Sequence, residues 1–166
     1  MRARCAIRPV SASELEQLAA LHAACFTDAW DADAFATLLA MPGAFALIAE
    51  EPERDAPSGF LMIRGAGEEA EIITLGVIPD QRRHGVAREL LAGGMREAAS
   101  RGARRLFLEV AADNAAALAL YRAASFTQVG HRADYYHRAD GDMAALVMAR
   151  DITIDGGGIE PIADYL

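Results

Sequence analysis

The chain has no lysine, only two cysteines and no long apolar run. All 16 basic residues are arginine, so the chain cannot be acetylated on a lysine of its own. Two cysteines, Cys5 and Cys25, make neither a disulfide framework nor a metal site, and we expect no metal. No stretch approaches the roughly 18 uninterrupted apolar residues of a membrane span, and the N-terminus lacks a signal-peptide pattern. These features predict a cytoplasmic protein without a membrane partner.

The composition is that of a soluble globular domain. With 166 residues, of which 53% are apolar and 24% charged, the chain is about the size of one domain. The net charge of −8 argues against a nucleic-acid partner and is compatible with a cationic substrate such as an amine or a basic peptide.

The chain is organised around the segment 71–100. Residues 71–78 form a β-branched apolar run that ends at Pro79, which predicts a strand. A turn over 81–87 contains Gly85, and apolar residues then recur at helical spacing. The first amides of such a helix have no intrahelical acceptor, and Gly85 lets the backbone approach a bound group. The segment predicts a main-chain cradle for a pyrophosphate.

The charge around this turn is basic. Residues 81–105 hold seven arginines and two glutamates, a local balance of +5 inside an acidic protein. This suits an anionic cofactor, although a solvated arginine-rich helix face would have the same composition.

Glu109 and Tyr121 are the candidates for proton chemistry. Glu109 lies within the apolar run 105–110, where a carboxylate is costly unless it is paired, hydrated or used. It could equally pair with an arginine at the sheet surface. On the next helix Asn114, Leu118 and Tyr121 share one face. Tyr121 could simply be a core residue, and Asn114 no more than an N-cap.

The remaining patterns complete an α/β prediction with a mixed sheet. Capping boxes at Ser11 and Ser13 predict a helix on which His22 is packed rather than catalytic; its buried face would be Leu15, Leu18, Ala19, His22 and Phe26. Asp31 or a neighbour caps a second helix. Further strands are expected at 4–10, 44–50, 59–64, 105–110, 126–134 and 142–150, and a helix from 113 or 114 to about 124. The order is β-α-α-β-β-β-α-β-α-β-β, with a parallel crossover through the central helix. One domain over 1–150 precedes a tail, 151–166, that we expect to be mobile or loosely docked.

Two stretches resemble a known family. Arg82-x-x-Gly85-x-Ala87 after a β-branched strand resembles the acetyl-CoA motif of the GNAT N-acetyltransferase superfamily. The stretch 108–126, Leu-Glu-Val-x-x-x-Asn-x-x-Ala-x-x-Leu-Tyr-x-x-x-x-Phe, closely resembles the bacterial ribosomal-protein alanine N-acetyltransferases within that superfamily. The element order is also the one the superfamily uses, and the resemblance covers roughly residues 5–150.

The resemblance implies an activity and a set of site residues. The activity would be acetyl transfer from acetyl-CoA to the N-terminal alanine of a ribosomal protein, with Glu109 as general base and Tyr121 as general acid. Acetyl-CoA would be contacted by Asn114, by the strand residues Leu75, Gly76 and Val77, and by the turn residues Arg82, Arg83, His84, Gly85, Val86, Ala87 and Arg88. The slot for the substrate's N-terminus would be bordered by Trp30, Arg132, Tyr135 and Tyr136.

Some features depart from the family, and alternatives stay open. Ser125 stands where the family usually has glycine, and Ala29 where a proline often precedes the tryptophan. The acceptor could instead be another peptide or a small amine. A covalent acetyl-enzyme on Cys25 or Cys5, or a non-catalytic acyl-CoA-binding protein, are further possibilities. A Rossmann-type nucleotide domain is disfavoured because the turn lacks G-x-G-x-x-G and a P-loop lysine.

Overall fold

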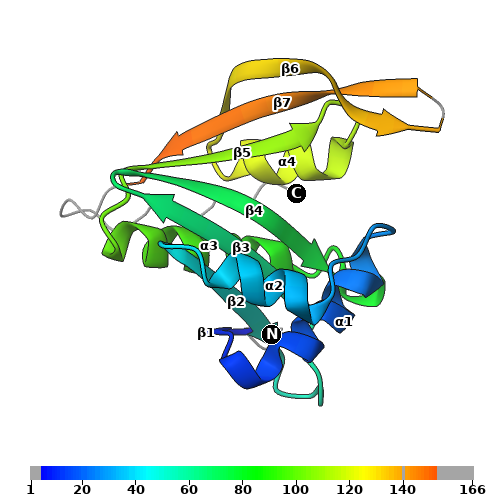
Figure 1. The fold of residues 1–166 in the computed structure, drawn as a ribbon, viewed down its shortest axis with the longest axis vertical. Helices are drawn as coiled ribbons and strands as arrows, with labels where there is room; N and C mark the ends of the chain where they lie inside the picture. The colour runs from blue at the N-terminus through cyan, green and yellow to red at the C-terminus, as the bar shows by residue number, and fades with distance from the viewer. Residues whose placement is uncertain (1–4, 140, 153–166) are drawn as a thin grey trace.

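The computed structural model describes residues 5–139 and 141–152, with the side chains of 134–138 excepted. Its strands form one seven-stranded sheet in the order β1-β2-β3-β4-β5-β7-β6 (Figure 1). In chain order the elements are β1 (Ala6–Pro9), η1 (Ala12–Glu14), α1 (Leu15–Cys25), α2 (Ala32–Leu39), β2 (Ala44–Glu50), β3 (Gly59–Ala66), β4 (Glu69–Val77), η2 (Pro79–Gln81), α3 (Val86–Ser100), β5 (Arg105–Ala111), α4 (Ala115–Ala123), β6 (Thr127–Arg138) and β7 (Gly141–Asp151). Apart from the short 3-10 turns, this order and the mixed sheet confirm the predicted fold class.

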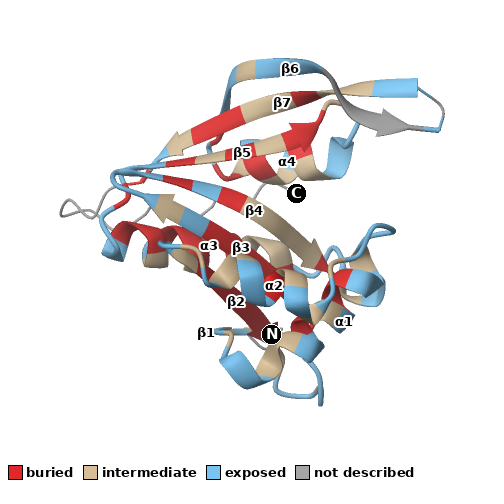
Figure 2. Cartoon of the chain, in the orientation of Figure 1, coloured by how far each residue is buried: buried red, intermediate tan, exposed pale blue. Residues whose placement is uncertain are grey.

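The core has two layers, one on each face of the sheet. One cluster joins α3 and α4 to the sheet, with Leu90 and Met95 of α3 buried against Leu61 of β3. The other packs α1 and α2 against the opposite face around Phe35 and Phe60. Figure 2 shows these buried residues along the strands and the inner sides of the helices. Burial of apolar area on both faces fixes the sheet as the middle layer.

The first helix is one residue shorter than its apolar pattern suggests. Leu18 and His22 are buried as expected, but Phe26 is 40% exposed, so the prediction that it belongs to the buried face is wrong. The reason is local: α1 ends at Cys25, and Phe26 takes an extended conformation that turns its side chain off the helix face. Asp31 caps α2 as predicted, accepting a hydrogen bond from the Ala34 amide.

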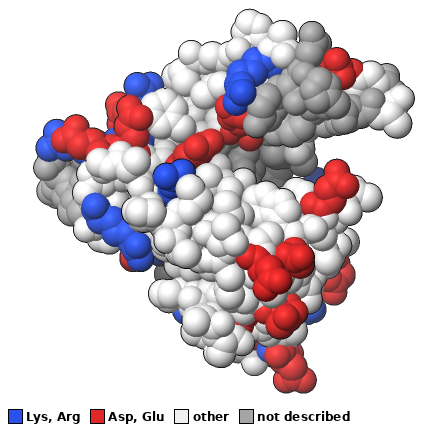
Figure 3. Space-filling model, viewed as in Figure 1, with Lys and Arg blue, Asp and Glu red and all other residues white. Residues whose placement is uncertain are grey.

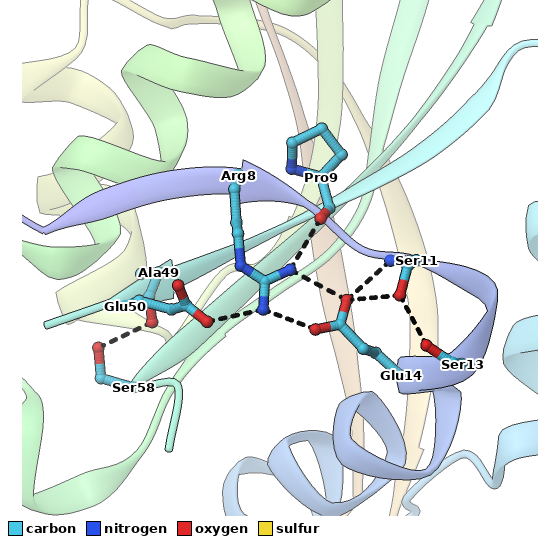
Figure 4. A network of polar contacts seen from close by, with 8 residues as sticks. All are labelled: Arg8, Pro9, Ser11, Ser13, Glu14, Ala49, Glu50 and Ser58. Carbon is cyan, nitrogen blue, oxygen red and sulfur yellow. Dashed lines mark hydrogen bonds and ion pairs between the residues drawn. The ribbon is translucent and has the colours of Figure 1, made fainter. Parts of the chain in front are cut away.

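An ionic network ties the first strand to its neighbours (Figure 4). The Arg8 guanidinium donates hydrogen bonds to Glu14 and Glu50, joining β1 to η1 and β2. Ser11 and Glu14 form the predicted capping box. Hydrogen bonds from Arg8 and then from the Ser11 amide lower the pKa of Glu14 to about 2.

The parallel pair β4 and β5 separates after three residues. Within the described residues their pairing runs only from Glu69–Arg105 to Glu71–Phe107, although both strands continue. Directly beyond, the register between β3 and β4 shifts, and Ile73 is left as an extra residue in β4. A bulge of this kind bends its strand and ends pairing. Figure 1 shows the result: the two strands meet at one end and diverge toward the other.

Helix α4 ends at Ala123, and Ser125, which stands where the resembled family usually has glycine, follows two residues later. Ser125 has φ 66, the left-handed conformation in which glycine is common. The Phe126 amide donates to Tyr121 O at 2.9 Å and the Ser125 amide to Arg122 O at 3.0 Å, which is a complete Schellman ending. The chain therefore makes the glycine-type turn with a serine, at a conformational cost.

The start of the expected tail is docked. β7 extends to Asp151, and Ile152 is buried, with its amide donating to Arg104 O at 2.8 Å. The rest of the expected tail, 153–166, lies outside the described residues.

Candidate functional site

The glycine turn leads into the first turn of α3, whose amides lie outside the helix's own hydrogen bonds. Arg83 (φ 63) and Gly85 (φ 84) are both left-handed, and α3 begins directly after them. The first intrahelical bond runs from the Glu89 amide to Gly85 O at 3.1 Å, so the amides from Gly85 to Arg88 have no intrahelical acceptor. A non-glycine residue in this conformation costs about 1–2 kcal/mol, and such strain gathers at ligand sites. The geometry suits an anion.

The side chains of this turn divide between solvent and core. Arg83 and His84 are exposed, whereas Val86 is buried and Ala87 is packed against the α3 core. Val86 can therefore offer a ligand only its main chain. A Cβ on Gly85 would meet no atom within 4 Å, so the positive φ, not lack of space, is the reason for glycine there.

The far half of β4 presents its backbone to the gap beside β5. The Ile78 amide donates to Ser58 O at 2.9 Å, on the β3 side. Because peptide groups alternate along an antiparallel strand, those of Leu75 and Val77 point the other way, toward the gap. The hydrogen bond that Arg82 Nε donates to Val77 O, at 2.9 Å, confirms that the Val77 carbonyl points away from β3. The Arg82 side chain thus closes the turn onto the end of β4.

Gly76 is required by packing. The N–H and C=O of Gly76 point toward β3. A Cβ added to Gly76 would come within 2.8 Å of the Phe60 ring and 3.0 Å of Cys25 Sγ. Any residue other than glycine would push α1 and β3 away from β4. A direct contact of Gly76 with acetyl-CoA stays a prediction.

Both cysteines are poor nucleophiles. Burial raises the pKa of the Cys25 thiol, and the nearby Arg82 opposes this only in part. Burial, then the charges of Glu51 and Glu89, raise the pKa of Cys5. Because the thiolate is the reactive form, these shifts disfavour a covalent acetyl-enzyme.

Glu109 and Arg132, predicted for different roles, are bonded to each other. The neighbours of Glu109 on β5, Leu108 and Val110, are buried, and its own side chain lies on the opposite face. Arg132 Nη1 of β6 donates to Glu109 Oε1 at 2.8 Å, with the carboxylate side chain 22% exposed and the arginine 54%. The alternative that Glu109 pairs with an arginine at the sheet surface is therefore realised in this structure.

Glu71 is a second carboxylate near this pair, and the sequence reasoning assigned it no role. It is the last β4 residue paired with β5, and it lies opposite Arg64 of β3. Partial loss of solvation and then the charge of Glu109 raise the pKa of Glu71, while Arg64 and Arg132 oppose the rise. The signal was available, because Glu71 is also a carboxylate in an apolar strand.

Asn114 and Tyr121 lie on α4, on the other face of the sheet. Asn114 is the N-cap, its Oδ1 accepting from the Ala117 amide at 3.1 Å. Tyr121 is buried, and its ring meets that of Phe126 edge-on at 5.7 Å between centroids. Tyr121 shares the α3–α4 core with Leu108, so it and Glu109 approach β5 from opposite sides.

Trp30 is positioned by His22. The Trp30 amide donates to His22 Nδ1 at 3.1 Å, and the two rings stack at 4.7 Å between centroids. Burial lowers the pKa of His22, which favours the neutral imidazole. Because Nδ1 accepts from the Trp30 amide, the proton of that neutral ring belongs on Nε2. His22 is thus packed, as predicted. The side chains of Tyr135 and Tyr136 lie outside the described residues.

The visible face of the molecule carries separate charged regions (Figure 3). Acidic side chains gather over the lower right of the view, where Figure 1 has α1 and neighbouring loops, and Asp28, Asp31 and Asp33 are exposed in this part of the chain. Among the described residues no group of three or more His, Cys, Asp or Glu side chains could hold a metal ion. No helix in the described ranges is long and apolar enough to cross a membrane.

Comparison with known proteins gives consistent matches. The profile of the Acetyltransferase (GNAT) family matches residues 15–126. The chain is 40% identical over 87 residues to ribosomal protein bS18-alanine N-acetyltransferase of Escherichia coli K12, a stretch of 52% of this chain and 59% of that protein. It is 46% identical over 69 residues to mycothiol acetyltransferase of Clavibacter michiganensis subsp. michiganensis, covering 42% of this chain and 22% of the relative. The chain thus matches under two thirds of the length of either relative.

Solved structures share the fold over nearly the whole chain. The E. coli ribosomal-protein-S18-alanine N-acetyltransferase superposes with a TM-score of 0.82 and 28% identity, covering 92% of this chain and 96% of that one. Arabidopsis thaliana NAA60 in complex with acetyl-CoA superposes with a TM-score of 0.77 and 22% identity, covering 89% and 98%. At that lower identity the likeness concerns the fold alone.

Proposed function

Because this chain belongs to the GNAT family of acetyltransferases, we propose that it transfers an acetyl group from acetyl-CoA to the N-terminal α-amino group of a protein. The acceptor we propose is a ribosomal protein that begins with alanine, as the name of the E. coli relative suggests for that enzyme. The observation that carries the proposal is the separation of β4 and β5, with Glu109 beside the gap and the α3 amides at its end.

The residues around the gap fit acetyl-CoA. The amides of Gly85 to Arg88 and the exposed Arg83 offer donors and positive charge to a pyrophosphate. The N–H and C=O of Leu75 and the N–H of Val77 offer a strand edge to an extended arm with its own amides, whereas the Val77 carbonyl is already bonded to Arg82. When bound, acetyl-CoA supplies the acetyl thioester that the acceptor amine attacks.

The side chains then move two protons. An α-amino group, whose ordinary pKa is about 8, must lose a proton before it attacks, and Glu109 accepts it directly or through a water. A C–N bond forms as the C–S bond breaks, and Tyr121 gives its proton to the leaving sulfur. The Val77 amide faces the gap and stabilises the negative charge on the carbonyl oxygen. General acid–base assistance of this kind contributes roughly 10²–10⁴-fold in rate.

A small-molecule amine is the second candidate acceptor. It is favoured by the 46% identity to a mycothiol acetyltransferase over 69 residues. The partly exposed Trp30, held in place by His22, favours the peptide because an aromatic wall suits an extended chain.

A panel of acceptors tests the assignment. Acetyl transfer is measured with short peptides that begin with alanine, serine or methionine, beside free lysine and polyamines. The same alanine peptide with a blocked N-terminus is the matched control. We expect the open alanine peptide to be preferred and the blocked peptide to be inert. Preference for a small amine over every peptide would overturn the acceptor and leave the family intact.

A further inference from the structure

Four charged residues from four strands lie across one face of the sheet at the point where β4 and β5 separate. Arg64 of β3 is the cross-strand neighbour of Glu71 on β4. Glu71 is in turn level with Phe107 on β5, two residues before Glu109 and on the same face. Arg132 of β6 completes the row through its bond to Glu109. The order of charges across the strands is positive, negative, negative, positive.

The two inner carboxylates repel each other, and a nearby cation relieves the repulsion. Like charges on neighbouring strands repel, and the pKa of Glu71 is raised partly by the charge of Glu109. In this structure Arg132 supplies positive charge to Glu109 from the solvent side, being 54% exposed against 22% for the carboxylate. Because the guanidinium is largely exposed, another cation can compete with it for the carboxylate.

We propose that Glu71 and Glu109 together bind the ammonium group of the acceptor, and that Arg132 occupies this site until the acceptor displaces it. An ammonium group has three donors and no acceptor, which suits two carboxylates from adjacent strands. The site lies where the strands part, so a cation held there is beside the gap that would hold the thioester. Glu71 is a positioning residue, and Arg132 is a competing internal cation. The inference rests on the proposed function.

The charge of Glu71 can be isolated by a binding experiment. The probes are two peptides: one begins with alanine, whose α-ammonium keeps its three donors and which CoA, having no acetyl group, cannot acetylate, and the other has a neutral lactyl group in place of alanine. Calorimetry at saturating CoA gives the ratio of their affinities for wild type and for Glu71→Gln. The matched control is Glu69→Gln, the same change on an exposed residue of the same strand, two residues farther from the gap.

We expect Glu71→Gln to reduce the preference for the cationic peptide about tenfold, with Glu71→Asp keeping most of it and Glu69→Gln unchanged. We also expect Arg132→Gln to tighten binding of the cationic peptide a few-fold. An unchanged preference in Glu71→Gln would overturn the role of Glu71, and no gain in Arg132→Gln would overturn the displacement. Because the readout is binding, a wild-type protein that binds the cationic peptide yet acetylates no peptide would overturn the proposed function alone.

Discussion

The carboxylate of Glu109 on β5 is bonded to the guanidinium of Arg132 on β6, with Nη1 and Oε1 2.8 Å apart. The two residues are 23 positions apart in the chain, and strand β7 lies between their strands. The bond crosses β7 on the face of the sheet opposite α4. The proposed base is therefore held by a cation of the protein itself.

Glu109→Gln should abolish most turnover. Glutamine keeps the shape of the side chain and can still accept a hydrogen bond from Arg132, but it cannot take a proton at neutral pH. We expect kcat to fall by about 10²–10⁴-fold, with little change in acetyl-CoA affinity measured by calorimetry. The acid limb of the pH–rate profile should also disappear. A variant whose profile matches the wild type would refute the role of Glu109.

Tyr121→Phe should slow the departure of the CoA sulfur from the acetyl group. The phenylalanine ring can keep the contact with Phe126, and removing one hydroxyl costs about 1 kcal/mol of stability. We expect kcat to fall 10²-fold or more with acetyl-CoA. The control is an acetyl thioester of a more acidic thiol, whose thiolate leaves without needing a proton. With this donor the kcat values of Tyr121→Phe and wild type should lie closer together. Equal losses with both donors would argue against proton donation by Tyr121.

Gly76→Ala should destabilise the fold. The new methyl group would lie 2.8 Å from the Phe60 ring, and overpacking of this kind typically costs about 1–3 kcal/mol. The control is Gly130→Ala, whose Cβ would meet Val147 at an ordinary 3.8 Å. Chemical denaturation compares the two variants. If Gly76→Ala keeps full stability and loses only acetyl-CoA affinity, the glycine serves the cosubstrate and not the packing.

Ser125→Gly should stabilise the protein. Glycine removes the strain of φ 66 in the folded state, which is about 1–2 kcal/mol. Part of this gain is offset because glycine also raises the conformational entropy of the unfolded chain. We expect a net gain of about 0.5–1 kcal/mol in the free energy of unfolding. Because Ser125 is exposed and lies beyond α4, Ser125→Ala is a suitable control that keeps the strain. A gain of equal size in the alanine variant would show that the backbone conformation is not the cause.

The buried His22 should make stability depend on pH. Its folded pKa is lowered by burial, so below the unfolded value of about 6.5 the unfolded chain binds more protons. The free energy of unfolding that the neutral His22 contributes is therefore fully present above about pH 6.5 and is lost as the pH falls. Urea unfolding at pH 7.5 and 5.5 measures the free energy of unfolding at each pH. We expect it to fall more between the two for wild type than for His22→Asn, whose side chain can still accept a hydrogen bond from the Trp30 amide. Equal losses would assign the dependence to other groups.

Local patterns in the sequence predicted the elements because each depends on residues close in the chain. The run 71–78, the turn at Gly85 and the helix behind it follow from β-branching, turn chemistry and 3.6-residue spacing. The N-cap at Asp31 and the capping box at Ser11 are equally local. The error at Phe26 has a local cause too, since periodicity continues past the residue where the backbone leaves the helix.

What the sequence did not predict depends on residues far apart. Ile72, Ile73 and Thr74 read as uninterrupted strand, and only their pairing with β3 reveals an extra residue. The contact of Glu109 with Arg132 and the closeness of Glu71 to both arise from strand order, which periodicity does not specify. The packing reason for Gly76 likewise comes from Phe60 and Cys25, on other elements.

The bulge at Ile73 has a consequence for solubility. By parting β4 from β5 it leaves two rows of backbone groups that a strand from another molecule could join, which is a route to aggregation. A ligand that lies along β4 would cover one of these rows. The concentrated protein should therefore precipitate more slowly on warming with acetyl-CoA than without it, beyond what a rise in its melting temperature alone produces.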